Sequence, residues 1–153
     1  MRTIKELLDF KGPTTIHSIA PDGSVFEAVT CMVENNIGAI LVLVDGSIKG
    51  IMTERDYLRF ITGRGRTARD TPVSELMTSK VIFLTPDTSL DEAMAIMTEA
   101  RIRHIPILDG GTLLGIVSIG DLVKQISSNR DVQLRNLEEY ISDPYPGPAN
   151  SGS

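Results

Sequence analysis

Two short apolar runs, separated by a turn, precede an amphipathic stretch in the second half of the chain. The runs cover residues 105–108 and 113–117, and Asp109-Gly110-Gly111 between them favours a tight turn with positive φ. Ser118 then occupies the place of a helix N-cap, with Asp121 three residues on and further apolar positions behind it at helical spacing. The pattern predicts a strand, a turn, a second strand and the start of a helix.

The same pattern occurs about 65 residues earlier, and self-similarity at a fixed offset indicates a duplicated unit. The match continues upstream without a gap, as far as Pro21-Asp22 in one copy and Pro86-Asp87 in the other. The recurring pairs at the end of each copy are Gly50 and Gly115, Thr53 and Ser118, and Asp56 and Asp121. Two copies of one unit therefore fill most of the chain.

Capping and turn residues predict the other elements of each copy. Ser24 with Glu27 forms a capping box that starts a helix, and Ser89 with Glu92 starts its counterpart. In the first copy, strands are expected at 39–44 and 48–52 and a helix at 54–61, while extended segments at 15–19 and 81–84 open the two copies. Each copy is predicted to be strand–helix–strand–strand–helix, with a sheet face that needs the other copy to cover it.

The pattern divides the chain into segments with different roles. In order they are a lead-in helix at 1–12, the first repeat at 13–62, a linker at 63–71, the second repeat at 72–128, a C-terminal helix at 129–142 and a disordered tail at 143–153. The linker is polar and basic, with Arg64, Arg66 and Arg69. We expect it to be solvated, and the alternative is a surface for an anion or a partner.

Composition narrows the possible functions. A chain of 153 residues with 41% hydrophobic residues can bury one good core, and its net charge of -5 argues against nucleic acid as the main partner. The single cysteine, Cys31, excludes an intrachain disulfide, and two histidines form no Cys/His cluster for a metal. No apolar run approaches the roughly 20 residues of a membrane span and no signal-peptide core is evident, so a cytoplasmic protein is expected.

The helix start at Ser118 has the chemistry of a nucleotide site. Free backbone N–H groups and the helix dipole favour an anionic phosphate there, and Asp121 can accept hydrogen bonds from a sugar diol. Arg103 and His104, at the start of the first strand, could add positive charge beside it. The alternative is structural: Ser118 caps the helix and Asp121 favours its dipole, without any ligand.

The first copy repeats the acidic site but lacks this positive edge. Gly38 and Ala39 stand at the equivalent strand positions, and Arg55 offers a replacement charge. The two sites are therefore expected to be unequal, with Asp121 favoured for ligands that carry phosphate.

Residues 50–56 and 115–121 share the order Gly, two apolar residues, Thr or Ser, two residues and Asp. This order, together with the run at 101–106, resembles the signature of the CBS (cystathionine β-synthase) domain, whose tandem pair is called a Bateman module. The resemblance covers about residues 15–126, and the chain looks like a stand-alone CBS-pair protein. It implies an α/β fold of two βαββα repeats packed sheet to sheet with pseudo-two-fold symmetry.

The resemblance also implies that the clefts between the repeats bind an adenosine-containing regulatory ligand. The candidates are AMP, ADP, ATP, NAD(H) and S-adenosylmethionine, and no catalytic cofactor is implied. Asp56 and Asp121 would hold ribose hydroxyls. The other implied contacts are Thr53 and Ser118 at ribose or phosphate, Arg55, Arg103 and His104 at phosphate, and Thr15, Ile16, Ala39, Val81, Ile82 and Pro106 around adenine.

Together these features predict a non-catalytic regulatory module that signals ligand binding to an unknown effector protein. The resemblance implies a homodimer formed through the helices after the signatures, to which Leu134 and Leu137 would add. The alternative is a dimerisation or protein-interaction module with vestigial nucleotide clefts. An enzyme is disfavoured, because the sequence shows no nucleophile–base pair at useful spacing and no phosphate loop.

Overall fold

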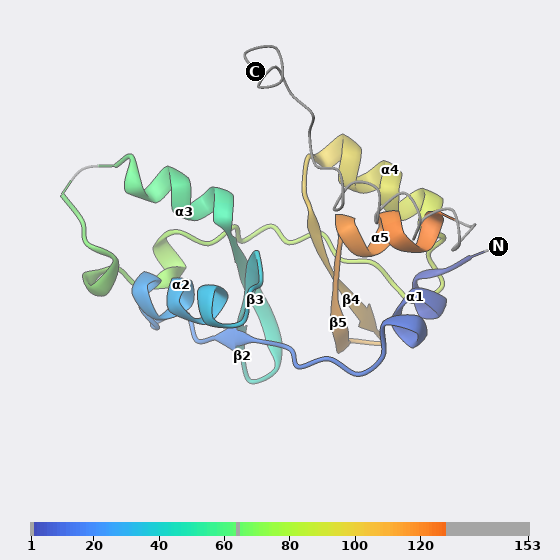
Figure 1. The fold of residues 1–153 in the computed structure, drawn as a ribbon. Coiled ribbons are helices and arrows are strands. Elements are labelled where there is room, and N and C mark those ends of the chain that lie inside the picture. The colour runs from blue at the N-terminus through green and yellow to red at the C-terminus, as the bar shows by residue number, and fades with distance from the viewer. Residues whose placement is uncertain (1, 64, 128–153) are drawn as a thin grey trace, which may run out of the picture.

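The computed structural model describes residues 2–63 and 65–127, which form helices and short strands (Figure 1). The C-terminal helix and tail expected at 129–142 and 143–153 lie outside the described residues, as does Arg64. The helices are α1 (Ile4–Lys11), α2 (Val25–Glu34), α3 (Glu54–Ile61), α4 (Leu90–Ala100) and α5 (Ile119–Ile126), with short 3₁₀ turns η1 (Ala68–Asp70) and η2 (Val73–Glu75). The strands are β1 (Ser18–Ile19), β2 (Ala39–Val44), β3 (Ser47–Thr53), β4 (His104–Asp109) and β5 (Thr112–Ser118).

The first repeat has the predicted order of elements. Its sheet has the order β1-β2-β3, with β1 parallel to β2 and β2 antiparallel to β3. The capping box at Ser24 is confirmed, since its hydroxyl accepts from the backbone of Glu27 and the Glu27 carboxylate accepts from Ser24. Helix α2 buries Val25, Ala28 and Met32, and the last two pack with strand residues in the core of this repeat.

The second repeat differs from the prediction at its opening strand. Residues 81–84 were expected to form the opening strand of this copy, but within them only Leu84 pairs with a strand, as a single parallel bridge to Ile107. Its N–H donates to Pro106 O at 3.0 Å and its carbonyl accepts from Leu108 N at 2.9 Å. The next bonds of a parallel ladder would need the N–H groups of Pro86 and Pro106, which proline lacks. The second sheet therefore has the two strands β4 and β5 only, among the described residues.

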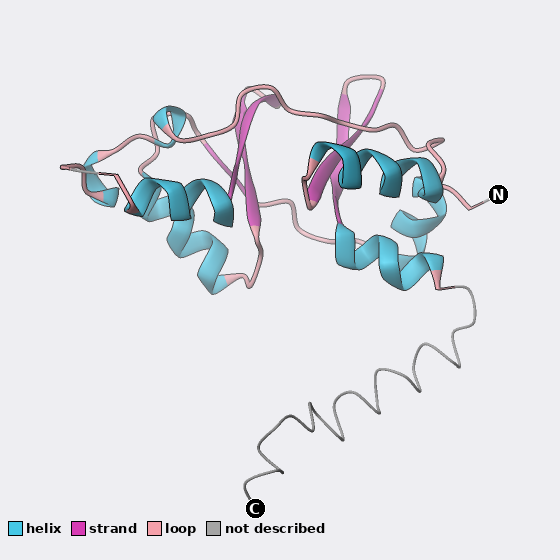
Figure 2. Ribbon diagram, turned by 90° about the horizontal axis from the view of Figure 1, so that it is seen from above, coloured by secondary structure: helices cyan, strands magenta, loops and turns pink. Residues whose placement is uncertain are grey.

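The two sheets face each other, as predicted, and the helices lie on their outer sides (Figure 2). Between the sheets, Ala39, Leu41 and Ile51 of the first repeat are buried. Leu113 and Ile116 of β5 pack against them. This apolar layer joins the repeats into one body and brings the starts of α3 and α5 toward each other.

Each repeat is completed by a segment that comes before the first strand of the other repeat. Helix α1 comes before the first repeat but packs on the second, where Ile4 and Leu7 belong to the core. Turn η2 opens the range assigned to the second repeat, but its Val73 lies in the core of the first. The backbone bonds match in pairs: Ile4 N to Thr88 O at 2.9 Å corresponds to Val73 N to Gly23 O at 2.7 Å.

The linker between the repeats contacts its own chain. Arg66 forms a two-pronged ion pair with Glu75, and the Arg69 guanidinium lies 3.8 Å from the centre of the Phe26 ring. These arginines remain partly or fully exposed, yet each has a partner within the repeat pair. The described part of the linker is mostly exposed to solvent, as expected, and these contacts and η1 also hold it against the repeats.

Candidate functional site

The start of α5 holds Asp121 in a reciprocal capping box. Ser118 Oγ accepts from Asp121 N at 3.1 Å, and Asp121 Oδ2 accepts from Ser118 N at 2.9 Å. This geometry fixes the carboxylate at the first turn of the helix, with 22% of its side chain exposed. The predicted N-cap is confirmed, and the Asp121 carboxylate stays partly accessible.

A lysine from the lead-in helix contacts the same carboxylate. Lys11, the last residue of α1, places Nζ 3.0 Å from Asp121 Oδ2 and 3.3 Å from Ile116 O. Burial of the Asp121 carboxyl favours its neutral form, but the hydrogen bonds from Ser118 and the ammonium of Lys11 outweigh this and lower its pKa. Asp121 is therefore ionised at neutral pH and already paired with a cation.

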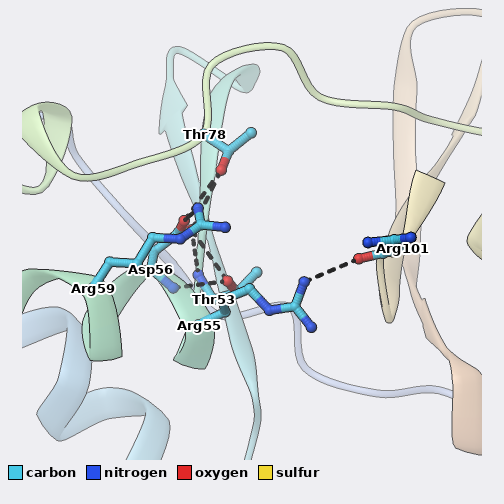
Figure 3. Close-up of polar contacts among 6 residues, drawn as sticks. All are labelled: Thr53, Arg55, Asp56, Arg59, Thr78 and Arg101. Atoms are coloured by element: carbon cyan, nitrogen blue, oxygen red, sulfur yellow. Dashed lines mark hydrogen bonds and ion pairs between the residues drawn. The ribbon is translucent and has the colours of Figure 1, made fainter.

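The start of α3 repeats the capping box with a different partner (Figure 3). Asp56 Oδ2 accepts from Thr53 N at 3.0 Å and from Thr53 Oγ1 at 3.1 Å. The Thr78 hydroxyl donates to Asp56 Oδ1 at 3.3 Å, and Arg59 Nη1 lies 3.8 Å from the same oxygen. Asp56 is only 6% exposed. At the first site a hydroxyl donates to the carboxylate and a guanidinium lies farther off, whereas at the second site an ammonium donates to it directly.

Side chains from both repeats converge beside Gly38, at the start of β2. A Cβ added to Gly38 would lie 2.6 Å from Glu54 Oε1 and 3.0 Å from His104 Cε1. His104 begins β4 and lies opposite Ser118 in the strand register. Burial lowers the pKa of His104, although the carboxylates of Glu54 and Asp121 oppose that shift. His104 is therefore neutral at neutral pH, and the expected positive edge comes from Arg103 and Lys11.

Arg55 reaches from the first repeat to the second (Figure 3). Its Nη1 lies 3.5 Å from the carbonyl oxygen of Arg101, the left-handed residue that ends α4. The side chain is exposed, so this long hydrogen bond leaves it free to turn toward an anion. The structure places Arg55 between the repeats, beyond the immediate surroundings of Asp56.

The residues expected around adenine fall into two groups. Ala39 is buried between the sheets, and Ile16 and Val81 pack against the same layer. Thr15 is exposed and Ile82 is 41% exposed. Pro106, also in the predicted set, is buried in β4 opposite Ile116. The structure thus gathers Ile16, Ala39 and Val81 between the repeats and leaves Thr15 and Ile82 outside this layer.

Four residues near the acidic groups were missed from the sequence: Lys11, Glu54, Arg59 and Thr78. A signal for the first and last was present, because residues 4–11 (IKELLDFK) resemble residues 73–80 (VSELMTSK). The duplication therefore extends into the lead-in segments, with a different spacing from the rest. That match predicts that both segments pack in equivalent places, and from them Lys11 reaches Asp121 and Thr78 reaches Asp56. The two residues are not at matching positions, since Lys11 aligns with Lys80 and Thr78 with Asp9.

Two other classes of site find no support in the described part of the chain. Across residues 2–63 and 65–127, no three His, Cys, Asp or Glu side chains gather in a way that could hold a metal ion. Within the same ranges, no helix has the length and apolar character needed to cross a membrane. The partly buried acidic groups at the helix starts therefore remain the candidate site.

The CBS domain family matches residues 13–63 and 73–128. The chain belongs to this family. It is 38% identical over 151 residues to the mitochondrial CBS domain-containing protein CBSX3 of Arabidopsis thaliana, a match that covers 94% of this chain and 73% of the relative. The crystal structure of the CBS domain NE2398 has 43% identity and a TM-score of 0.77, and the match covers 83% of this chain and 98% of that one.

More distant CBS-pair structures have been solved with ligands. CBSX2 in complex with AMP is 23% identical, with a TM-score of 0.72 over 85% of this chain and 99% of that chain. The CBS pair of MJ0100, in complex with 5′-methylthioadenosine and S-adenosyl-L-methionine, is 21% identical, with a TM-score of 0.71 over 82% of this chain and 96% of that one. At these identities the likeness shows a common fold.

Proposed function

We propose that this CBS pair is a non-catalytic regulatory module that binds an adenosine-containing ligand between its repeats and signals to an effector protein. The observation that carries the proposal is the paired arrangement of Asp56 and Asp121. Each carboxylate is fixed by a capping box at the start of a helix, and the apolar layer between the sheets brings those helix starts toward each other. A fixed carboxylate next to apolar side chains suits a ribose with an attached base.

The ligand complexes of the distant relatives support this class of ligand. CBSX2 is bound to AMP, and the MJ0100 pair is bound to two adenosyl compounds. The common fold can therefore accommodate adenosine in two chains whose sequences differ widely from this one. Among the candidates we favour a phosphorylated ligand at Asp121, because Arg103 and Lys11 supply positive charge there. A cytoplasmic location is part of the proposal.

Calorimetric titration of the purified chain with AMP, ATP, NADH and S-adenosylmethionine tests the proposal. We expect at least one of them to bind with a dissociation constant below about 1 mM, which corresponds to about 4 kcal/mol of binding free energy. Mass spectrometry of small molecules that copurify with the chain would identify a tightly held ligand. Failure of all four to bind at millimolar concentration, with none copurifying, contradicts the proposal.

We further propose that the chain is a homodimer, formed through the outer faces of α3 and α5. Leu58 and Ile61 of α3 are 59% and 53% exposed, and Val123 of α5 is 53% exposed. Exposed apolar side chains on neighbouring helices are typical of an interface. The same surface would serve the alternative function, in which the chain is a dimerisation module with vestigial nucleotide clefts.

Replacing Ile61 by Asp tests the dimer. A charge placed at an apolar interface without a partner costs about 3 kcal/mol or more, so the dimer should dissociate at concentrations about 100-fold higher than in the wild type. Sedimentation equilibrium measures this change. Leu114→Asp is the control, because Leu114 is 42% exposed but lies on β5, away from the outer helices. A mass that is monomeric in the wild type, or equally dimeric in Ile61→Asp, contradicts this interface.

A further inference from the structure

We propose that Lys11 makes the Asp121 site selective for phosphorylated nucleosides, by moving from the Asp121 carboxylate to the ligand's phosphate when the ribose binds. This inference rests on the proposed function, and it names the residue that decides which adenosine compounds the second site accepts. It concerns a residue of the lead-in helix that lies outside both residue ranges matched by the family.

The hydrogen bonds around Asp121 show why Lys11 must move. Asp121 Oδ2 accepts from Ser118 N at 2.9 Å and from Lys11 Nζ at 3.0 Å. A carboxylate oxygen has two lone pairs, so these donors fill Oδ2. A ribose diol that donates one hydroxyl to each carboxylate oxygen therefore has to replace one of them. The Ser118 N–H is fixed by the backbone of the capping box, which leaves Lys11 as the donor that can leave.

Departure of Lys11 from Asp121 separates its ammonium from the carboxylate and leaves the carbonyl of Ile116, at 3.3 Å, as its acceptor. Arg103 and Lys11 both act on the pKa of His104 as nearby positive charges, together with the nearby carboxylates of Glu54 and Asp121. A nucleoside without phosphate would displace Lys11 from Asp121 and offer it no anion in exchange. A 5′-phosphate offers Lys11 and Arg103 a common anion, and hydrogen bonds between charged groups are about twice as strong as neutral ones. The exchange is therefore favourable only for a phosphorylated ligand.

The exchange requires only the Lys11 side chain to rotate. Helix α1 is held to the second repeat by Ile4 and Leu7, which are 0% and 2% exposed, and by the Arg2 guanidinium, which donates to the carbonyls of Gln125 and Ile126. The Lys11 side chain is 31% exposed and lies at the end of this fixed helix. The helix thus keeps the ammonium within reach of both the carboxylate and a phosphate.

The first repeat lacks this device and serves as an internal contrast. Asp56 accepts from the neutral Thr78 hydroxyl, at 3.3 Å from Oδ1 and 3.4 Å from Oδ2. The cation near Asp56, Arg59, lies 3.8 Å from Oδ1 with a side chain that is 71% exposed, so a ribose that displaces the Thr78 hydroxyl does not separate a hydrogen-bonded ion pair. Selection for phosphate by charge exchange is therefore confined to the Asp121 site.

Calorimetry with AMP and adenosine, in the wild type and in Lys11→Met, tests the inference. We expect the ratio of the AMP affinity to the adenosine affinity to fall by about tenfold in Lys11→Met, with adenosine binding more tightly than to the wild type because it no longer has to displace a cation. Lys5→Met is the matched control, since Lys5 is an exposed lysine on the same helix, and it should leave the ratio unchanged. An Asp56→Asn background limits the measurement to the second site.

The outcomes separate this inference from the proposed function. An unchanged AMP-to-adenosine ratio in Lys11→Met, with AMP still bound, overturns the role of Lys11 and leaves the proposed function intact. A ratio that falls equally in Lys5→Met overturns the role as well, because it would reflect net charge alone. If the wild type binds S-adenosylmethionine but none of AMP, ATP and NADH, selection for phosphorylated nucleosides is wrong and the broader function stands.

Discussion

Replacing Asp121 by Ala should weaken AMP binding at the second site by at least about 30-fold, because the ribose loses two hydrogen bonds to a charged acceptor. The structure supports this expectation because the Asp121 carboxylate is ionised, fixed by Ser118 and partly accessible. Calorimetry measures the affinity. Circular dichroism melting checks that the variant still folds, since loss of one capping-box partner costs only about 1 kcal/mol.

Asp109→Ala is the matched control for that measurement. Asp109 ends β4 and is exposed in the turn, so its removal changes the net charge by the same amount without touching the helix start. We expect AMP affinity in Asp109→Ala to stay within about twofold of the wild type. Equal affinities in the wild type and Asp121→Ala would mean that this carboxylate only caps α5, which is the structural alternative.

Gly50→Ala should destabilise the chain by about 2–4 kcal/mol, because the added methyl group has no room. A Cβ at Gly50 would lie 2.4 Å from Met77 Sδ and 2.9 Å from the carbonyl oxygen of Thr78. Met77 can rotate away, but the Thr78 backbone is held by two hydrogen bonds to Ile51, at 3.0 and 2.8 Å. Relief of the clash therefore breaks these bonds and pulls the Thr78 hydroxyl from Asp56. Chemical denaturation measures the loss.

Gly115→Ala is the natural comparison, since Gly115 holds the same signature position in the other repeat. The nearest atom to a Cβ there is Leu8 Cδ2 at 3.8 Å, which is ordinary van der Waals contact. We expect a change in unfolding free energy within about 1 kcal/mol, because the backbone also gains rigidity from the substitution. Equal destabilisation by the two substitutions would show that the lead-in segments do not pack as described.

The duplicated pattern predicted most of the fold because each copy repeats the same apolar periodicity and the same capping residues. The bounds of α3 and β2 are those expected from apolar periodicity, and the capping box at Ser24 forms as expected. The packing of the sheets followed from a simple argument, since a small sheet with an uncovered apolar face needs a partner. Family membership, indicated by two signatures in register, is confirmed by the match to residues 13–63 and 73–128.

Other features depend on contacts between residues far apart in the sequence, and these were not predicted. The third strand of the second sheet does not form, because prolines at 86 and 106 lack the N–H groups that would extend the ladder on either side of Leu84. The sequence of either segment alone does not reveal this. The pairing of Lys11 with Asp121 depends on how α1 crosses to the far repeat. The neutral state of His104 follows from its burial, whereas flanking arginines suggested a charged group.

The crossing of the lead-in segments interlocks the two halves of the chain. A fragment that starts after residue 12 would lack Ile4 and Leu7. Their loss would leave a cavity in the core of the second repeat, although the deleted segment precedes the first. During folding, the core of the second repeat is complete only when α1, at the amino terminus, has docked on it. This contact joins residues far apart in the sequence, and such contacts slow folding. Melting should therefore be a single cooperative event, with no stage at which one half survives alone.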